Sequence, residues 1–292
     1  MQELELAAKI RTLTSLTDVV TAMRTLAAVR LRQAQEHFAG LARYAEATRA
    51  ALAQGLALLG TAPNAPAAGA VGAPRLLIAC FSEHGFVGAL NERLLEKLRA
   101  TSRPADERLA LYVLGSRGLR LCDERGTEVA RRDSMPTTLA GLSATAHRVT
   151  EEVFAAIAEG SYGAVELLFM RHQEGAVQGV TRLPLFPPLV EVAPSGDRRK
   201  PPLHTLPAPA LLIQLIEEFC FGQIIWALAE AFAAEHGARF QTMEAARRNM
   251  EEMLQELGQQ ERALRQEVIT NEILEVAAGA DLAYLAAMEG GR

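Results

Sequence analysis

Proline is absent from both ends of this chain, and aromatic residues are scarce throughout it. All 13 prolines lie between Pro63 and Pro209. Because proline removes a backbone donor and clashes with the preceding helical turn, its absence leaves both ends free to form long helices. Aromatic residues make up only 5% of the chain, whereas alanine and leucine are abundant. This composition favours helices over a β-sandwich or a barrel.

Cysteine and strong charge are also lacking. The three cysteines, Cys80, Cys122 and Cys220, show no CxxC pair and no metal-ligand spacing. We therefore expect reduced thiols and no metal site. The net charge of −5 argues against nucleic acid as the main partner. The six histidines form no pair at metal spacing, and we expect no cofactor.

Long uncharged apolar runs are missing as well. The first ten residues carry Glu3, Glu5 and Lys9, so they do not resemble a secretory signal. The most apolar run, 208–234, is interrupted by glutamates. We expect it to be too polar to span a bilayer.

The two proline-free ends each carry a heptad pattern. We expect a coiled-coil helix over 1–59, an α/β domain over 75–200 and a second coiled-coil helix over 210–286, with a Pro/Gly/Ala linker at 60–74. The first seam is Leu6, Ile10, Leu13, Val20, Ala27, Leu31, Ala34, Phe38, Leu41 and Ala45. The second runs through Leu211, Leu215, Phe219, Trp226, Ala229, Ala233, Met243, Ala246, Met250, Met253, Leu257, Leu264, Val268 and Leu274.

Short apolar runs alternate with helical patterns in the middle. We predict strands at 75–81, 108–115 and 164–172, a weaker one at 127–133, and helices at 89–100 and 145–160. This alternation is typical of a small, mainly parallel, Rossmann-like α/β domain. The segment 181–202 is too rich in proline to be a central strand.

Neither long helix can be stable alone, because each has an apolar stripe with no cover. The first would be roughly 85 Å long and the second roughly 110 Å. Both leave or enter the same α/β domain, so we expect them to pair as a long antiparallel coiled coil with that domain inserted between them. Such a shape suits the transmission of force better than catalysis.

Four stretches in this order resemble the gamma subunit, or central stalk, of F-type ATP synthases. They are "DVVTAMRTLAAVRLRQAQ" (18–35), "SEHGFVGALN" (82–91), "AEHGARFQTMEAARRN" (234–249) and "ALRQEVITNEILEVAAGA" (263–280). The match covers both helices well and the middle weakly. Asp18, Thr21, His84 and Val87 depart from the family pattern, which is typical of a divergent or alternate copy.

The resemblance implies a non-catalytic part of a rotary motor for ATP synthesis and hydrogen ion transport. In this family the two helices turn inside a hexamer of alpha and beta subunits. The lower part and the α/β domain sit on the c-subunit ring beside the epsilon subunit. Membrane contact is then made only through that ring, on the cytoplasmic face of the bacterial inner membrane. Ion-driven rotation changes the state of the catalytic beta subunits.

The resemblance also implies contact residues. The family residues that match Met23, Arg239, Gln266 and Thr270 contact loops of the beta subunit. Arg30 and Arg32 could face the surrounding alpha–beta ring, although a solvated helix face fits them as well.

Two other functions remain open on the residues alone. The loop "FSEHGFVGALN" (81–91) follows an expected strand and precedes an expected helix, so it could cradle a phosphate at a helix N-terminus. The chain would then be a nucleotide- or phosphate-binding domain with helical dimerisation arms. However, the loop matches neither G-x-G-x-x-G nor a Walker A motif. The other alternative is a coiled-coil adaptor with no motor role.

Overall fold

A computed structural model describes residues 2–58, 74–101, 109–173, 176–190 and 203–289. The expected linker at 60–74 therefore lies almost wholly outside the described residues. The chain divides into two compact units. One comprises Thr25–Thr242, and the other comprises Met1–Arg24 with Met243–Arg292.

The larger unit is built on a five-stranded sheet with the order β3-β2-β1-β4-β5. Strands β1 (Arg75–Cys80), β2 (Leu109–Leu114), β3 (Arg131–Asp133) and β4 (Ala164–Gln173) run parallel. Strand β5 (Ala176–Phe186) pairs antiparallel with β4 at the edge, where its proline costs no ladder hydrogen bond. The mainly parallel sheet is confirmed.

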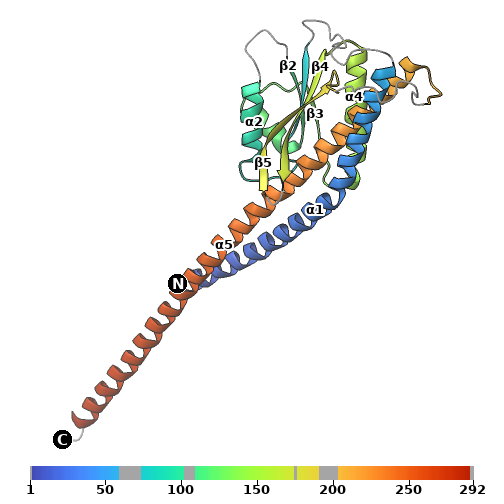
Figure 1. Ribbon diagram of the computed structural model, residues 1–292. Coiled ribbons are helices and arrows are strands. Elements are labelled where there is room, and N and C mark those ends of the chain that lie inside the picture. The colour runs from blue at the N-terminus through green and yellow to red at the C-terminus, as the bar shows by residue number, and fades with distance from the viewer. Residues whose placement is uncertain (1, 59–73, 102–108, 174–175, 191–202, 290–292) are drawn as a thin grey trace. The chain divides into compact units, whose positions relative to one another are not determined.

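Both faces of the sheet are covered (Figure 1). Alternate side chains of the strands point to opposite faces. On one face Leu77 and Val113 pack with α2 (Leu90–Thr101) and α3 (Ser116–Glu124). On the other face Ile78 and Leu167 pack with α4 (Ala140–Ala158) and with the two long helices. Since both faces are buried, the central strands read as continuous apolar runs.

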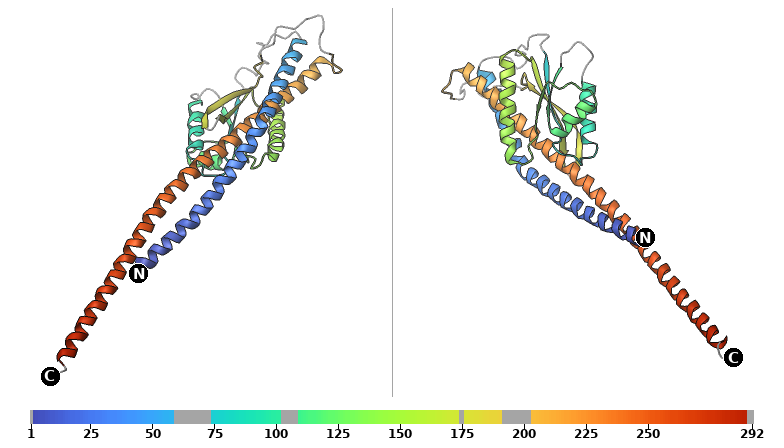
Figure 2. Two further views of the ribbon diagram at one scale, coloured as in Figure 1. Left: turned by 60° about the horizontal axis from the view of Figure 1, so that its bottom comes forward. Right: turned by 180° about the vertical axis from the view of Figure 1, so that it is seen from behind.

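The two long helices are α1 (Gln2–Leu58) and α5 (Ala208–Glu289). In the larger unit they run antiparallel, and Figures 1 and 2 show them side by side. Gly222 of α5 lies against Thr48 of α1, and Leu215 lies against Gly55. The buried seam of α1 includes Ala27, Ala34 and Ala45, as the heptad pattern predicts, and it continues to Leu52, which was not among the predicted residues.

Helix α5 is continuous, although its sequence contains four glycines: Gly222, Gly237, Gly258 and Gly279. At Gly222 a Cβ atom would lie 2.9 Å from Thr48 Oγ1 and 3.6 Å from Ala45 Cα. The glycine therefore allows a close approach of the two helices, and tertiary packing outweighs its poor helix propensity.

In the smaller unit the same two helices pair again. Leu6, Val20 and Met243 are buried there, and Leu13 and Leu257 line one groove. Arg24, a polar residue of α1 between Val20 and Ala27 of the seam, donates to Glu244 across the pair at 2.8 Å. Glu244 also accepts from Arg247 and Arg248. These arginines, Arg247 first, lower the pKa of Glu244 to about 2.

The predicted second seam extends too far. Val268 is 39% exposed and Leu274 is 61% exposed. The paired part of the smaller unit includes Leu13 and Leu257, which line one groove. The described side chains of α5 beyond Leu257 are mostly exposed.

Two further predictions need correction. Helix α3 was not predicted, because only nine residues carry its pattern. The expectation that 208–234 is too polar to span a bilayer is wrong when hydropathy is the only criterion. Helix α5 contains an 18-residue window with a mean hydropathy of 1.5. Most of Phe219–Ala234 is buried within the larger unit, which accounts for its apolar character.

Candidate functional site

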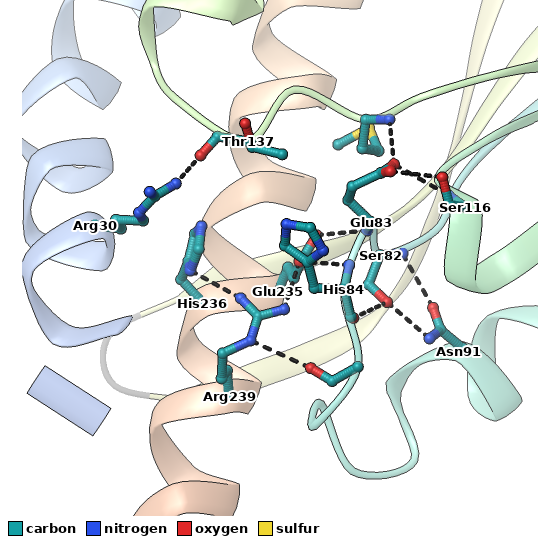
Figure 3. Close-up of polar contacts among 12 residues, drawn as sticks. Arg30, Ser82, Glu83, His84, Asn91, Ser116, Thr137, Glu235, His236 and Arg239 are labelled. Atoms are coloured by element: carbon teal, nitrogen blue, oxygen red, sulfur yellow. Dashed lines mark hydrogen bonds and ion pairs between the residues drawn. The ribbon is translucent and has the colours of Figure 1, made fainter. Parts of the chain in front are cut away.

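The most polar buried cluster joins α5 to the loop between β1 and α2 (Figure 3). Its centre is Glu235, a side chain only 4% exposed. The Glu235 carboxylate accepts from the backbone N–H groups of Glu83 at 3.0 Å and His84 at 3.3 Å. It therefore takes the place that a solvent molecule or an anion would otherwise occupy at these amides.

Arg239 lies one turn further along α5 and completes the cluster. Its guanidinium donates to the Glu235 carboxylate at 2.6 Å, to the Gly85 carbonyl at 3.2 Å and to His236 Nδ1 at 3.0 Å. Burial, with the nearby charges of Arg239, Arg30 and His84, lowers the pKa of His236 to about 3. The imidazole is thus neutral and can accept the arginine N–H.

The other side of the loop is tied to the sheet. The Glu83 carboxylate accepts from the Ser116 amide at 3.1 Å and hydroxyl at 2.5 Å, and from the Met135 amide at 2.9 Å. A carboxylate at Ser116 also suits the N-terminus of α3. Asn91 accepts from the Ser82 amide at 3.0 Å and donates to its hydroxyl at 2.8 Å.

These contacts bear on the phosphate-binding alternative. A phosphate cradle needs free backbone N–H groups. Here the amides of Glu83, His84 and Ser116 already donate to carboxylates of the chain itself. A phosphate placed there would meet two negative side chains, Glu83 and Glu235. The loop is therefore a structural junction rather than an anion site.

The predicted contact residues are placed as follows. Arg239 belongs to the buried cluster and is only 6% exposed. Arg30 of α1 donates to the Thr137 carbonyl beside it (Figure 3), and its charge reaches His236. Arg32 is exposed and pairs with Glu36 on its own helix at 3.3 Å. Met23 is half-buried, in the smaller unit.

Gln266 and Thr270 lie together on one face of α5. Both side chains are exposed, and the Thr270 hydroxyl donates to the Gln266 carbonyl at 2.8 Å. Exposed apolar residues lie in the same stretch of α5. Val268, Ile269, Ile273, Leu274 and Val276 are each at least 39% exposed.

Sequence reasoning missed the acids that hold the cluster. Glu235 was not singled out, and no structural contact was predicted for Glu83 or for Glu230, which accepts from the His172 amide at 3.0 Å. Glutamate is almost never buried without a partner, so an acid within an apolar helix stretch such as "ALAEAFAAEHGARF" (227–240) was the available signal.

The cysteines are free and buried. Burial raises the pKa of Cys80 to about 12, and burial with the nearby Glu217 raises that of Cys220 to about 12, so neither thiol is activated. Within the described ranges, no group of three or more His, Cys, Asp or Glu side chains could hold a metal ion.

Comparison with known proteins yields one consistent family. The family model described as ATP synthase matches residues 2–282. The chain is 28% identical to the ATP synthase gamma chain of Moorella thermoacetica, over 95% of this chain and 97% of that one. It is also 28% identical to the ATP synthase gamma chain of Rhizorhabdus wittichii, over 94% and 97%.

Solved structures share the fold. A chain of the Euglena gracilis mitochondrial ATP synthase rotor matches with a TM-score of 0.66 at 16% identity, covering 92% of this chain and 99% of that one. A chain of the Tetrahymena thermophila mitochondrial ATP synthase central stalk and c-ring matches with a TM-score of 0.53 at 15% identity, covering 78% and 99%.

Proposed function

Since the chain belongs to the ATP synthase family, whose model matches residues 2–282, we infer that it is the gamma subunit of a rotary ATP synthase. It forms the central stalk and couples rotation of the ion-driven ring to conformational change in the catalytic alpha–beta hexamer. It makes and breaks no covalent bonds itself. Its whole-length similarity to curated gamma chains supports this role.

One structural observation carries the proposal. The described turns of α5 after Leu257 present apolar side chains to solvent, among them Ile273 at 64% and Val276 at 73% exposure. Contiguous exposed apolar residues mark an interaction site. A stalk that inserts this end of α5 into an alpha–beta hexamer would cover them.

The partners follow from the same role. They are the alpha and beta subunits around the helices, and the epsilon subunit and c-subunit ring at the α/β domain. The protein is peripheral to the membrane, and we place it on the cytoplasmic face of a bacterial inner membrane. Its departures from the family pattern suit a divergent or alternate copy of the enzyme.

We keep the six contact residues as proposals. Gln266 and Thr270 have the exposed, polar side chains that a beta-subunit loop could bind. Arg32 is similarly accessible. Met23 offers a flexible apolar contact. Arg30 and Arg239 already donate hydrogen bonds to carbonyl groups of this chain. They would contact partner subunits while keeping these bonds.

The test is assembly with alpha and beta subunits of the same organism, purified through a tag on beta. We expect the chain to co-purify with the hexamer and to hydrolyse no ATP when alone. Ile273→Asp with Leu274→Asp should reduce its recovery. Asn271→Asp, which adds charge at an exposed polar position of the same segment, is the matched control. Robust ATPase activity of the isolated chain would contradict the proposal.

Within an assembled complex, Gln266→Ala with Thr270→Ala should lower ATP synthesis while leaving the helix intact. Unchanged coupling would show that these two contacts are assigned wrongly.

A further inference from the structure

We propose that three buried charged residues of α5, namely Glu230, Glu235 and Arg239, are the links that transmit force between the sheet and the stalk helix. This inference rests on the proposed function, because only a rotating stalk must pass force from its α/β domain to its helix. The three residues position the helix against the sheet, and they touch no substrate.

Their burial is the first argument. Glu230, Glu235 and Arg239 are 6%, 4% and 6% exposed. Buried charges require strong partners, and a helix meant only to pack on a sheet could use apolar residues here. The helix does so at neighbouring positions, where Ala227, Leu228 and Ala231 join the core.

Their partners are the second argument. All three residues reach backbone groups at the carboxyl ends of β1 and β4. Glu230 accepts from the His172 amide at 3.0 Å. Glu235 accepts from the amides of Glu83 and His84, and Arg239 donates to the Gly85 carbonyl at 3.2 Å. Backbone groups cannot rotate away as side chains can, so a force applied to them reaches the strand itself.

The loop that receives two of these residues is itself tied to its surroundings by hydrogen bonds (Figure 3). Asn91 ties the Ser82 backbone, and Glu83 ties the loop to Ser116 of α3 and to Met135. A force on α5 at Glu235 is therefore passed to β1, α2 and α3 together rather than absorbed by the loop.

The remaining contacts between helix and sheet are apolar. They combine small side chains, such as Ala227 and Ala231, with large ones, such as Leu228 and Phe232. Apolar burial is non-directional, so it opposes separation of the helix from the sheet more than displacement along it. Charge-assisted hydrogen bonds are short and directional, so they supply the missing resistance.

Amide hydrogen exchange of the chain tests the links directly. The variants are Glu235→Ala and, in case that variant does not fold, Glu235→Gln and Arg239→Lys. Glu217→Ala is the matched control, because Glu217 is an exposed glutamate of the same helix. We expect exchange at the Glu83 and His84 amides to quicken by about 10-fold or more in the Glu235 variants. The control should match the unaltered chain.

The functional readout is ion-driven ATP synthesis by the reconstituted complex. We expect the Glu235 variants to assemble with the hexamer yet to make ATP several-fold more slowly than the control. Equal synthesis rates, or unchanged exchange at the two amides, would overturn the inference. Failure of the unaltered chain to join the hexamer would instead overturn the proposed function.

Discussion

Helices α1 and α5 approach each other closely at Gly222. This approach decides whether Gly222→Ala raises or lowers the free energy of unfolding. Replacing a glycine by alanine inside a helix ordinarily stabilises it by about 1 kcal/mol. At Gly222 the added Cβ would lie 2.9 Å from Thr48 Oγ1 and 3.4 Å from Tyr44 Cε1. Overpacking of this kind costs about 1–3 kcal/mol. We therefore expect Gly222→Ala to lower the free energy of unfolding by as much as about 2 kcal/mol.

Thr48 cannot yield without loss. It is 7% exposed, and its hydroxyl donates to the Ala45 carbonyl at 3.0 Å. Thr48→Ala should remove the clash, so the two substitutions together should be less harmful than their separate effects imply. The expected coupling is about 1 kcal/mol or more. Gly40→Ala is the control, because a Cβ at Gly40 would meet no other part of the described chain within 4 Å.

The assay is urea unfolding of the whole chain followed by circular dichroism. Gly40→Ala should stabilise by about 1 kcal/mol. If Gly222→Ala stabilised the chain equally and showed no coupling to Thr48→Ala, the two helices would not approach as closely as described. The pairing of the stalk helices in the larger unit would then need another register.

Two further predictions concern His236 of the buried cluster and Phe86 of the loop beside it. The pKa of His236 is lowered to about 3 in the folded chain, against about 6.5 when unfolded. Between these two pH values only the unfolded state binds the proton on His236. The free energy of unfolding should therefore decrease as the pH is lowered below about 6.5, by up to about 1.4 kcal/mol per pH unit. His236→Gln, which can still accept from Arg239, should flatten urea-unfolding stability against pH; an unchanged profile would mean that His236 is not its source. Phe86 has a φ of 61° and a side chain 63% exposed. Phe86→Gly should therefore raise the unfolding free energy by up to about 1 kcal/mol, and a loss measured by the same assay would show that the exposed ring contributes more than the strain.

Local patterns were enough to predict most elements. The heptad spacing predicted α1 almost to its ends, and the apolar runs at 75–81, 108–115 and 164–172 became β1, β2 and β4. The proline-rich segment was expected away from the centre of the sheet, and β5 lies at the edge. Such features depend on residues within a few turns of each other, so periodicity alone reports them.

The candidate site was predicted less well. Arg239, Gln266 and Thr270 were chosen by resemblance, and their contacts with other subunits stay predictions. The contacts of the acids Glu83, Glu230 and Glu235 were not predicted, because each bonds to a segment distant in the chain. Glu235, for example, binds amides 152 and 151 residues away, and no local pattern in a single sequence records such a pairing.

The amino-acid sequence alone determined two long helices with an α/β domain between them. The spacing of apolar side chains and the placement of proline were sufficient, because helix and strand periods are local properties. The tertiary structure alone decided where the α1–α5 seam stops, which left Ile273 and Val276 uncovered. It also determined that the two helices approach closely where Gly222 meets Thr48. In addition, it determined that charged side chains of α5 bond to backbone groups at the ends of strands. Those outcomes depend on register and on atoms far apart in the chain, and only folding brings such atoms into contact.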